Sequence, residues 1–310
     1  MEADGMRILV VGAGAVGGYF GGRLAEKGED VTFLVRDKRE HQLKEHGLHI
    51  ESVHGDHHFQ PKTLKAEEKA EPFDVVLLST KAYHLEGAID SLHPFVGENT
   101  MILPLLNGMS HVDDLIEAFG GEKVIGGLCF VESTLDGSGK VIQTSPIHDL
   151  VFGERNGDRT DRITKLEEAF SGTKANFRLS DAIQQEMWHK YLFITTLSGV
   201  TSLYRAPIGP IRETGEGEGR IKAVLSQAAM VMRKLEAPLA EKIEDALFDK
   251  ISGMGYSMKS SLQRDMEKNL SVEADHLYGY LLEAAESQEV EVPDLRLIYG
   301  NLKIYEIASQ

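Results

Sequence analysis

The stretch Gly12-Ala13-Gly14-Ala15-Val16-Gly17 decides the fold of the first part of this chain. It has the spacing G-x-G-x-x-G and follows the apolar run Arg7 to Val11, which predicts a buried strand that stops at glycine. The residues from Ala15 to Lys27 have helical periodicity and end at Gly28, and residues 30–35 predict a second strand. Strand, glycine turn, helix and strand within about 30 residues form a βαβ unit.

In this context the glycines predict a dinucleotide-binding turn. Gly12 permits a tight turn, Gly14 lets the backbone approach a pyrophosphate, and Gly17 lets the helix pack closely on the strand. The amino end of the helix supplies N–H groups and partial positive charge for phosphates. We therefore expect residues 12–17 to bind the cofactor through their backbone, a purely structural glycine turn being the alternative.

Arg36 indicates which dinucleotide binds. It stands nineteen residues past Gly17, where an NAD-binding protein usually has an acidic residue for the ribose hydroxyls. An arginine at this place can form a fork onto a 2′-phosphate. Lys38 and Arg39 add positive charge nearby, whereas Asp37 could bind the ribose instead. The sequence favours NADP (NADPH) over NAD.

Strand and helix patterns go on alternating after this unit, which predicts an α/β fold with a mostly parallel sheet covered on both faces. Residues 48–64 predict irregular β structure, and an antiparallel hairpin is expected at 141–152 with its turn at Pro146. The other predicted elements are strands at 74–79, 100–103 and 124–131, and helices at 81–92, 109–119 and 163–171.

From about Asp181 the pattern changes to helical periodicity alone. The sequence therefore predicts an N-terminal Rossmann-type, NADP-binding domain at 1–180 and an all-α substrate and catalytic domain at 181–310, with a ligand cleft between them. The helices predicted in the second domain span 182–203, 219–235, 240–254 and 272–287.

Composition excludes several classes of function. The chain has 33 Lys and Arg against 49 Asp and Glu, a formal net charge of −16. This balance argues against nucleic acid or an anionic membrane as the partner, because both need a basic face. The single cysteine, Cys129, excludes an intrachain disulfide, and no apolar run suits a signal peptide or membrane span. We expect a cytoplasmic enzyme with a small-molecule substrate, and a homodimer is left open.

Histidines are concentrated in one segment and raise the question of a metal site. Their spacing fits no standard zinc pattern, and hydride transfer needs no metal, so none is predicted. The six histidines are His41, His46, His49, His54, His57 and His58.

Further short motifs follow in a fixed order outside the glycine turn. They are Thr80-Lys81-Ala82, Leu106-Asn107-Gly108, Trp188 with Lys190, the run from Ser260 to Asp265, Glu273 and Val292-Pro293. Together with residues 12–36, these motifs make nearly the whole chain resemble the ketopantoate reductase (2-dehydropantoate 2-reductase) family.

The resemblance implies a reaction and a set of site residues. The reaction is the NADPH-dependent reduction of ketopantoate to pantoate, a step toward pantothenate and coenzyme A. Lys190 takes the place of the family's catalytic lysine and Glu273 that of its substrate-anchoring glutamate. Lys81 and Asn107 match cleft residues, and Ser261 matches a contact to the substrate carboxylate.

The chemistry of these side chains agrees with such roles, although each has a plainer alternative. Hydride transfer to a ketone builds negative charge on oxygen, which the ammonium of Lys190 can stabilise and protonate. Glu273 can accept a substrate hydroxyl, Asn107 can contact the nicotinamide ribose or the substrate carbonyl, and Lys81 can attract an anion. The alternatives are a surface lysine for Lys190, a first-turn charge for Glu273 and a turn residue for Asn107. They are a solvated lysine for Lys81 and a helix cap for Ser261.

Two positions depart from the family. The resemblance implies asparagines four and eight residues after the catalytic lysine, and this chain has Ile194 and Ser198. Ile194 cannot donate or accept a hydrogen bond through its side chain, so Ser198, Thr195 and Thr196 are the candidates for substrate contacts. A paralogue that reduces another branched 2-keto acid is therefore an alternative. An opine-type or hydroxyacid dehydrogenase and a non-catalytic NADP sensor are the others.

Overall fold

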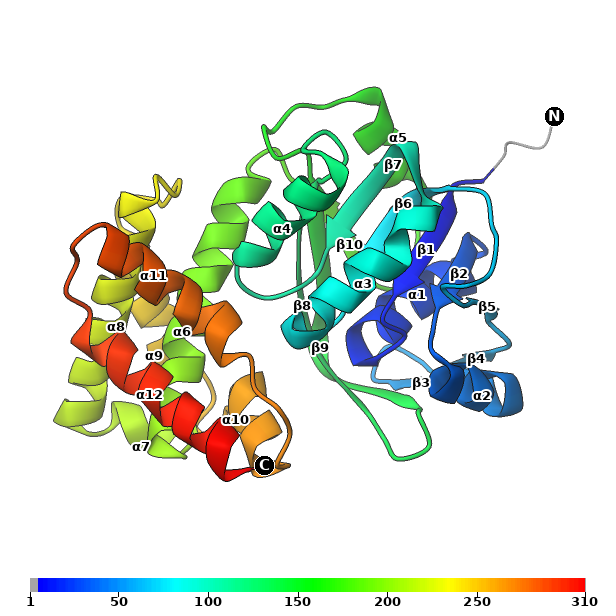
Figure 1. Ribbon diagram of the computed structural model, residues 1–310. Coiled ribbons are helices and arrows are strands. Elements are labelled where there is room, and N and C mark those ends of the chain that lie inside the picture. Colours follow the sequence, from blue (N-terminus) through cyan, green and yellow to red (C-terminus); the bar gives the residue numbers. More distant parts are fainter. Residues whose placement is uncertain (1–4, 310) are drawn as a thin grey trace. The chain divides into compact units, whose positions relative to one another are not determined.

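The computed structural model describes residues 5–309, which form two compact units (Figure 1). Within these residues, one unit comprises 5–106 and 111–184, and the other comprises Asn107–Ser110 and 185–309. The segment Asn107–Ser110 thus belongs with the later part of the chain, although the residues on both sides of it belong with the earlier part.

The first unit contains a five-stranded parallel sheet in the order β5-β2-β1-β6-β7. The crossover from β1 to β2 runs in the opposite direction to that from β6 to β7, so right-handed connections place helices α1 and α3 on opposite faces. This doubly wound arrangement confirms the predicted Rossmann-type fold. The elements are β1 (Arg7–Val11), α1 (Ala15–Lys27), β2 (Asp30–Leu34), β5 (Lys62–Leu64), β6 (Phe73–Leu78), α3 (Leu85–Leu92) and β7 (Val96–Pro104).

A second sheet in the same unit has the order β10-β9-β3-β4, with β8 paired to β9. Helix α1 contacts both sheets. A Cβ atom at Gly21 would lie 2.7 Å from Val10 Cγ2 in the first sheet, and one at Gly22 would lie 2.5 Å from Ile50 Cδ1 in the second. These glycines therefore allow α1 to pack between the sheets. The strands are β3 (Leu48–Ser52), β4 (His57–Phe59), β8 (Gly126–Leu135), β9 (Val141–Gly153) and β10 (Asn176–Leu179).

The predicted hairpin at 141–152 is wrong. Residues Val141–Gly153 form the single strand β9, which pairs antiparallel with β8 and parallel with β3 and β10. The register between β8 and β9 changes between Val131 and Ser133, and Pro146 lies opposite this irregular stretch. Proline lacks an N–H group and cannot donate to a neighbouring strand. Because the β8–β9 pairing is already irregular at Pro146, no regular hydrogen bond is lost there, and the strand continues.

The remaining helices of this unit include one that the sequence analysis did not predict. Helix α2 (Asp37–His46) buries only Leu43, so it has little apolar periodicity to reveal it. The predicted helix at 81–92 begins as a short 3₁₀ turn and becomes α-helical at Leu85. The other elements are η1 (Ala82–His84), η2 (His93–Phe95), α4 (Ser110–Phe119) and α5 (Asp161–Phe170).

The second unit is helical throughout its described elements, as predicted (Figure 1). Helix α6 is its longest helix, and every residue from Tyr191 to Ser202 except Ile194 is buried. The last helix, α12, was not predicted, although Pro293 at its start is a typical first-turn residue. The elements are α6 (Ile183–Tyr204), α7 (Ile208–Arg212), α8 (Gly215–Lys234), α9 (Ile243–Ser252), α10 (Ser261–Glu267), the π-helix η3 (Asp275–Gly279), α11 (Tyr280–Ser287) and α12 (Pro293–Ala308). In the described part of the chain, no helix is both long and apolar enough to cross a bilayer.

Candidate active site

The glycine turn after β1 combines tight packing at two of its glycines with open space at the third. Gly12 has φ +88°, and a Cβ atom at Gly17 would lie 2.2 Å from both Gly12 O and Ser79 Oγ. At Gly14, in contrast, a Cβ atom would meet nothing within 4 Å, and no side chain caps the helix that begins at Ala15. Gly17 is thus needed for packing, whereas Gly14 leaves an open space at the amino end of α1, where N–H groups can receive an anion.

Two side chains that the sequence analysis did not assign to the turn hold its shape. Ser79, directly after β6, donates a hydrogen bond from Oγ to Gly12 O at 3.0 Å. Arg39 donates from Nε to Ala13 O at 2.9 Å and from Nη1 to Gly139 O at 2.9 Å, and burial lowers its pKa. The guanidinium of Arg39 therefore supports the backbone of the turn.

Arg36 and Lys81 lie at the same edge of the first sheet as the turn, because each follows the carboxyl end of a parallel strand. Arg36 is exposed at the start of α2, and a Cβ atom at Gly87 would lie 3.7 Å from its Nη2. Lys81 is exposed at the start of η1. This edge can thus present two cations beside the open end of α1.

Lys190 is unusual among the lysines because it is almost completely buried. Only 8% of it is exposed, on a stretch of α6 where Trp188 is also 8% and Tyr191 1% exposed. The Tyr191 hydroxyl donates to Leu277 O at 2.6 Å, and burial raises its pKa well above the ordinary value, so it stays protonated. A buried ammonium is costly unless it serves a partner or a reaction.

The face of α6 beyond Lys190 presents few polar groups. Ile194 and Ser198 follow at one and two turns, within an arc of about 80° from Lys190. Ile194 is partly exposed, so an apolar side chain borders the accessible space one turn from the ammonium. Three of the five serine and threonine hydroxyls of this helix donate to its own carbonyls, as Thr196 Oγ1 does to Leu192 O at 2.9 Å. Thr195 Oγ1 is buried and has no hydrogen-bond partner among the residues that the structure describes.

The two serines at the start of α10 have different roles. Ser260 is buried and caps the helix by accepting from Gln263 N at 3.1 Å, and its Oγ is 2.8 Å from Thr201 Oγ1 of α6. Ser261, the predicted carboxylate contact, is exposed at the first helical position. The capping alternative therefore applies to Ser260, and the Ser261 hydroxyl is accessible.

Glu273 and Asn107 are connected through the π-helix η3. Glu273 is half-buried two residues before η3 begins, and its carbonyl accepts from Leu277 N at 3.0 Å. Asn107 is bound from the same turn, because His276 Nε2 lies 2.6 Å from Asn107 O. A π-turn is rare in proteins and is frequently found at functional sites. Within the second unit, η3 therefore joins the Glu273 and Asn107 segments and is bound to α6 through Tyr191.

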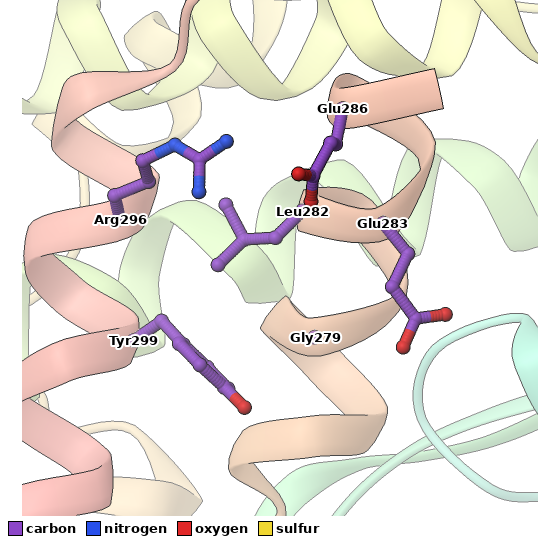
Figure 2. A pocket seen from close by; sticks show the side chains of 6 residues that line it. All are labelled: Gly279, Leu282, Glu283, Glu286, Arg296 and Tyr299. Atoms are coloured by element: carbon purple, nitrogen blue, oxygen red, sulfur yellow. The ribbon is translucent and has the colours of Figure 1, made fainter. Parts of the chain in front are cut away.

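A shallow groove in the second unit lies apart from these residues. It is lined by residues of α12 and of the η3–α11 segment (Figure 2), and it includes none of the predicted site residues. Figure 2 shows Arg296 and Tyr299 on one side and Leu282 on the other, with the Glu283 carboxylate directed away from them. The lining residues are Gly279, Leu282, Glu283, Glu286, Arg296 and Tyr299.

The clustered histidines make protein contacts. His54 stacks on His148 with ring centroids 3.6 Å apart, His148 Nδ1 lies 2.7 Å from the Tyr19 hydroxyl, and His58 Nε2 lies 2.7 Å from His46 O. In the described residues, no group of three or more His, Cys, Asp or Glu side chains has a metal-binding arrangement.

Comparison with known proteins gives a consistent family. The profile described as "Ketopantoate reductase PanE/ApbA" matches residues 8–157, and that described as "Ketopantoate reductase PanE/ApbA C terminal" matches residues 182–306. An "Uncharacterized oxidoreductase YkpB" of Bacillus subtilis (strain 168) is 47% identical over 301 residues, which cover 97% of this chain and 99% of that protein.

Solved structures agree over the same length. The 2-dehydropantoate 2-reductase from Geobacter metallireducens GS-15 is 26% identical with a TM-score of 0.86, and the match covers 96% of this chain and 99% of that one. A D-mandelate dehydrogenase solved with NADH and anilino(oxo)acetate is 21% identical with a TM-score of 0.87, covering 98% and 99% of the two chains. At this identity, the similarity to the D-mandelate dehydrogenase shows the fold alone.

Proposed function

Because this chain belongs to the ketopantoate reductase family of nicotinamide-dependent 2-keto acid reductases, we propose that it reduces ketopantoate to pantoate with NADPH. The observation that carries the proposal is the nearly buried Lys190 on α6, bordered by partly exposed Ile194 and followed by Ser198 on the same arc. An ammonium in such surroundings is suited to give a proton to an oxygen that is becoming negative.

The residues of the first unit would hold the cofactor. The open space at Gly14 and the N–H groups that begin α1 fit a pyrophosphate, and Arg36 would form a fork onto the 2′-phosphate. Lys81, at the same sheet edge, would add positive charge near the phosphates or the substrate carboxylate. NADPH, when bound, supplies the hydride that the keto carbon receives.

The residues of the second unit would hold the substrate and move the proton. Lys190 would donate its proton to the carbonyl oxygen as the C–O group becomes an alcohol, and solvent would return a proton to the amine. Glu273 would accept a hydrogen bond from a substrate hydroxyl, Asn107 would orient the nicotinamide ribose or the carbonyl, and Ser198 and Ser261 would contact polar ends of the substrate.

The test is NADPH oxidation with ketopantoate and a panel of other 2-keto acids, run in parallel with NADH. We expect turnover with ketopantoate and a preference for NADPH. Activity only on other 2-keto acids would reject the substrate and keep the reaction class. Activity that requires an amine would indicate an opine-type enzyme, and tight NADPH binding without any turnover would indicate a sensor.

Ile194 favours a second candidate, a 2-keto acid whose branched side chain carries no hydroxyl group. An apolar side chain one turn from Lys190 offers nothing to a substrate hydroxyl, and an unmatched hydroxyl in an apolar pocket is costly. The test compares ketopantoate with its analogue that lacks the hydroxyl. If this candidate is correct, the analogue is preferred, and Ile194→Asn shifts the ratio of the two kcat/KM values toward ketopantoate by about 10-fold. An unchanged ratio would rule out contact between residue 194 and this part of the substrate.

A further inference from the structure

His276 binds the segment Asn107–Ser110 at two points. Its Nε2 lies 2.6 Å from the carbonyl oxygen of Asn107, and its Nδ1 lies 2.8 Å from Ser110 Oγ. The imidazole also covers Gly108, where a Cβ atom would lie 3.0 Å from Nε2 and φ is +83°. The ring therefore contacts a backbone carbonyl on one side of a left-handed glycine and a side-chain hydroxyl on the other.

The partners define the hydrogen positions on the ring. A carbonyl oxygen can only accept, so Nε2 carries the hydrogen that is donated to Asn107. In the neutral ring Nδ1 then accepts the hydroxyl hydrogen of Ser110. Both nitrogens are satisfied at once, and the two hydrogen bonds restrain a segment whose glycine would otherwise have wide conformational freedom.

The histidine is itself held in place by α6. It lies in η3, and the next two residues of that π-helix are bonded to α6: Tyr191 donates to Leu277 O at 2.6 Å, and the Tyr278 hydroxyl donates to Thr195 O at 2.8 Å. A continuous series of contacts thus runs from the residue beside Lys190, through η3, to the backbone of Asn107.

We propose that His276 is a positioning residue that fixes the Asn107 backbone, and so the Asn107 side chain, relative to Lys190. This inference rests on the proposed function for the meaning of that geometry. His276 touches neither reacting atom in this scheme; it acts through Asn107. Displacement of a substrate-orienting group by about 1 Å can cost about 100-fold in rate, so loss of the two bonds should be measurable in turnover.

The experiment uses three variants of His276 in the full chain. His276→Gln keeps a donor near Nε2 for Asn107, His276→Asn keeps a polar group near Nδ1 for Ser110, and His276→Phe keeps only the ring. We expect His276→Phe to lower kcat/KM for the 2-keto acid by about 10- to 100-fold, and His276→Gln to retain more activity than His276→Asn. In an Asn107→Ala background the effect of His276→Phe should disappear, because the two residues act as one unit.

Tyr299→Phe is the matched control. It removes a 2.6 Å hydrogen bond to Asp275 Oδ1 in the same π-helix without touching the Asn107 segment, and kcat/KM should stay within about twofold. Additive effects of His276→Phe and Asn107→Ala, or an equal loss in Tyr299→Phe, would overturn the proposal.

Amide hydrogen exchange separates this inference from the proposed function. If His276 holds the segment, His276→Phe raises exchange at residues 107–110 and Tyr299→Phe does not, whether or not any 2-keto acid is reduced. Absence of turnover in the unmodified chain would reject the proposed function alone. Unchanged exchange at residues 107–110 in His276→Phe would reject the positioning role.

Discussion

The candidate residues of the two units are arranged in different ways. In the first unit, six consecutive residues, Gly12–Gly17, form the turn, and its shape is fixed by backbone approach and by contacts from Ser79 and Arg39. In the second unit, Lys190 lies 83 residues along the chain from both Asn107 and Glu273, and their segments are connected only through tertiary contacts.

This difference indicates that phosphate recognition and substrate choice depend on different kinds of structure. A backbone turn recognises a group common to many ligands, the phosphate, and tolerates few residue types. A group of side chains from separate segments determines the reaction and the substrate. Replacement of one of them, as by Ile194 here, can change the substrate while the fold is kept. Cofactor binding and turnover should therefore respond separately to mutation.

The largest expected effect is that of Lys190→Ala. Loss of the proposed proton donor should lower kcat by about 1,000-fold, while the Kd for NADPH should change by less than about threefold, because the proposed phosphate contacts lie in the other unit. Steady-state kinetics and a fluorescence titration of NADPH measure the two quantities.

Lys250→Ala is the matched control for this lysine. Lys250 lies in α9 and is exposed, with its Nζ 4.4 Å from the centre of the Phe193 ring; partial desolvation lowers its pKa, yet it has no proposed role in the reaction. We expect it to keep kcat within about twofold and to cost about 0.5–1 kcal/mol of stability. Comparable losses of kcat in both variants would mean that Lys190 is structural.

A pair of glycine substitutions comes next. Gly17→Ala places a Cβ atom 2.2 Å from Gly12 O and should reduce the free energy of unfolding by at least about 2 kcal/mol. Gly14→Ala meets nothing within 4 Å in the protein, so stability should hold while NADPH affinity falls by about 10-fold or more. Thermal unfolding with and without NADPH tests both, and a stability loss in Gly14→Ala would contradict the open space.

The smallest expected effect concerns cofactor choice. Arg36→Ala should raise the KM for NADPH by about 10-fold and leave that for NADH nearly unchanged, since a charge-assisted hydrogen bond to the 2′-phosphate contributes about 1.5 kcal/mol or more. Lys38→Ala, at an exposed neighbour, is the control. An equal change for NADH and NADPH would place Arg36 away from the phosphate.

The sequence predicted the local parts of this molecule well. The βαβ unit could be identified because strand, turn and helix signals are contiguous, and the helical second unit could be identified from its periodicity. Helix α2 was not predicted because it buries a single apolar residue. The continuous strand β9 was not predicted because Pro146 is typical of turns. Helix α12 could have been found, since Val292-Pro293 precedes a periodic apolar pattern.

The candidate site was harder to predict than the fold. Ser79 and Arg39 have ordinary sequence surroundings, and only the folded turn shows that they hold it. His276 lies 169 residues from Asn107, so no local pattern connects them. Ser260 and Ser261 are adjacent in the sequence. The residue at which α10 begins decides which of them caps the helix and which is accessible. Roles that depend on such long-range or one-residue differences require coordinates.

The assignment of Asn107–Ser110 to the second unit has a consequence for how this protein can be divided. The chain passes from one unit to the other after Leu106, Ser110 and Gln184. A fragment that starts at residue 185 would lack the peptide that occupies both nitrogens of His276, and a fragment that stops at residue 184 would carry that peptide without its histidine. Each fragment therefore lacks one partner of this contact. A domain exchange with a relative should transfer residues 107–110 together with the helices of the second unit.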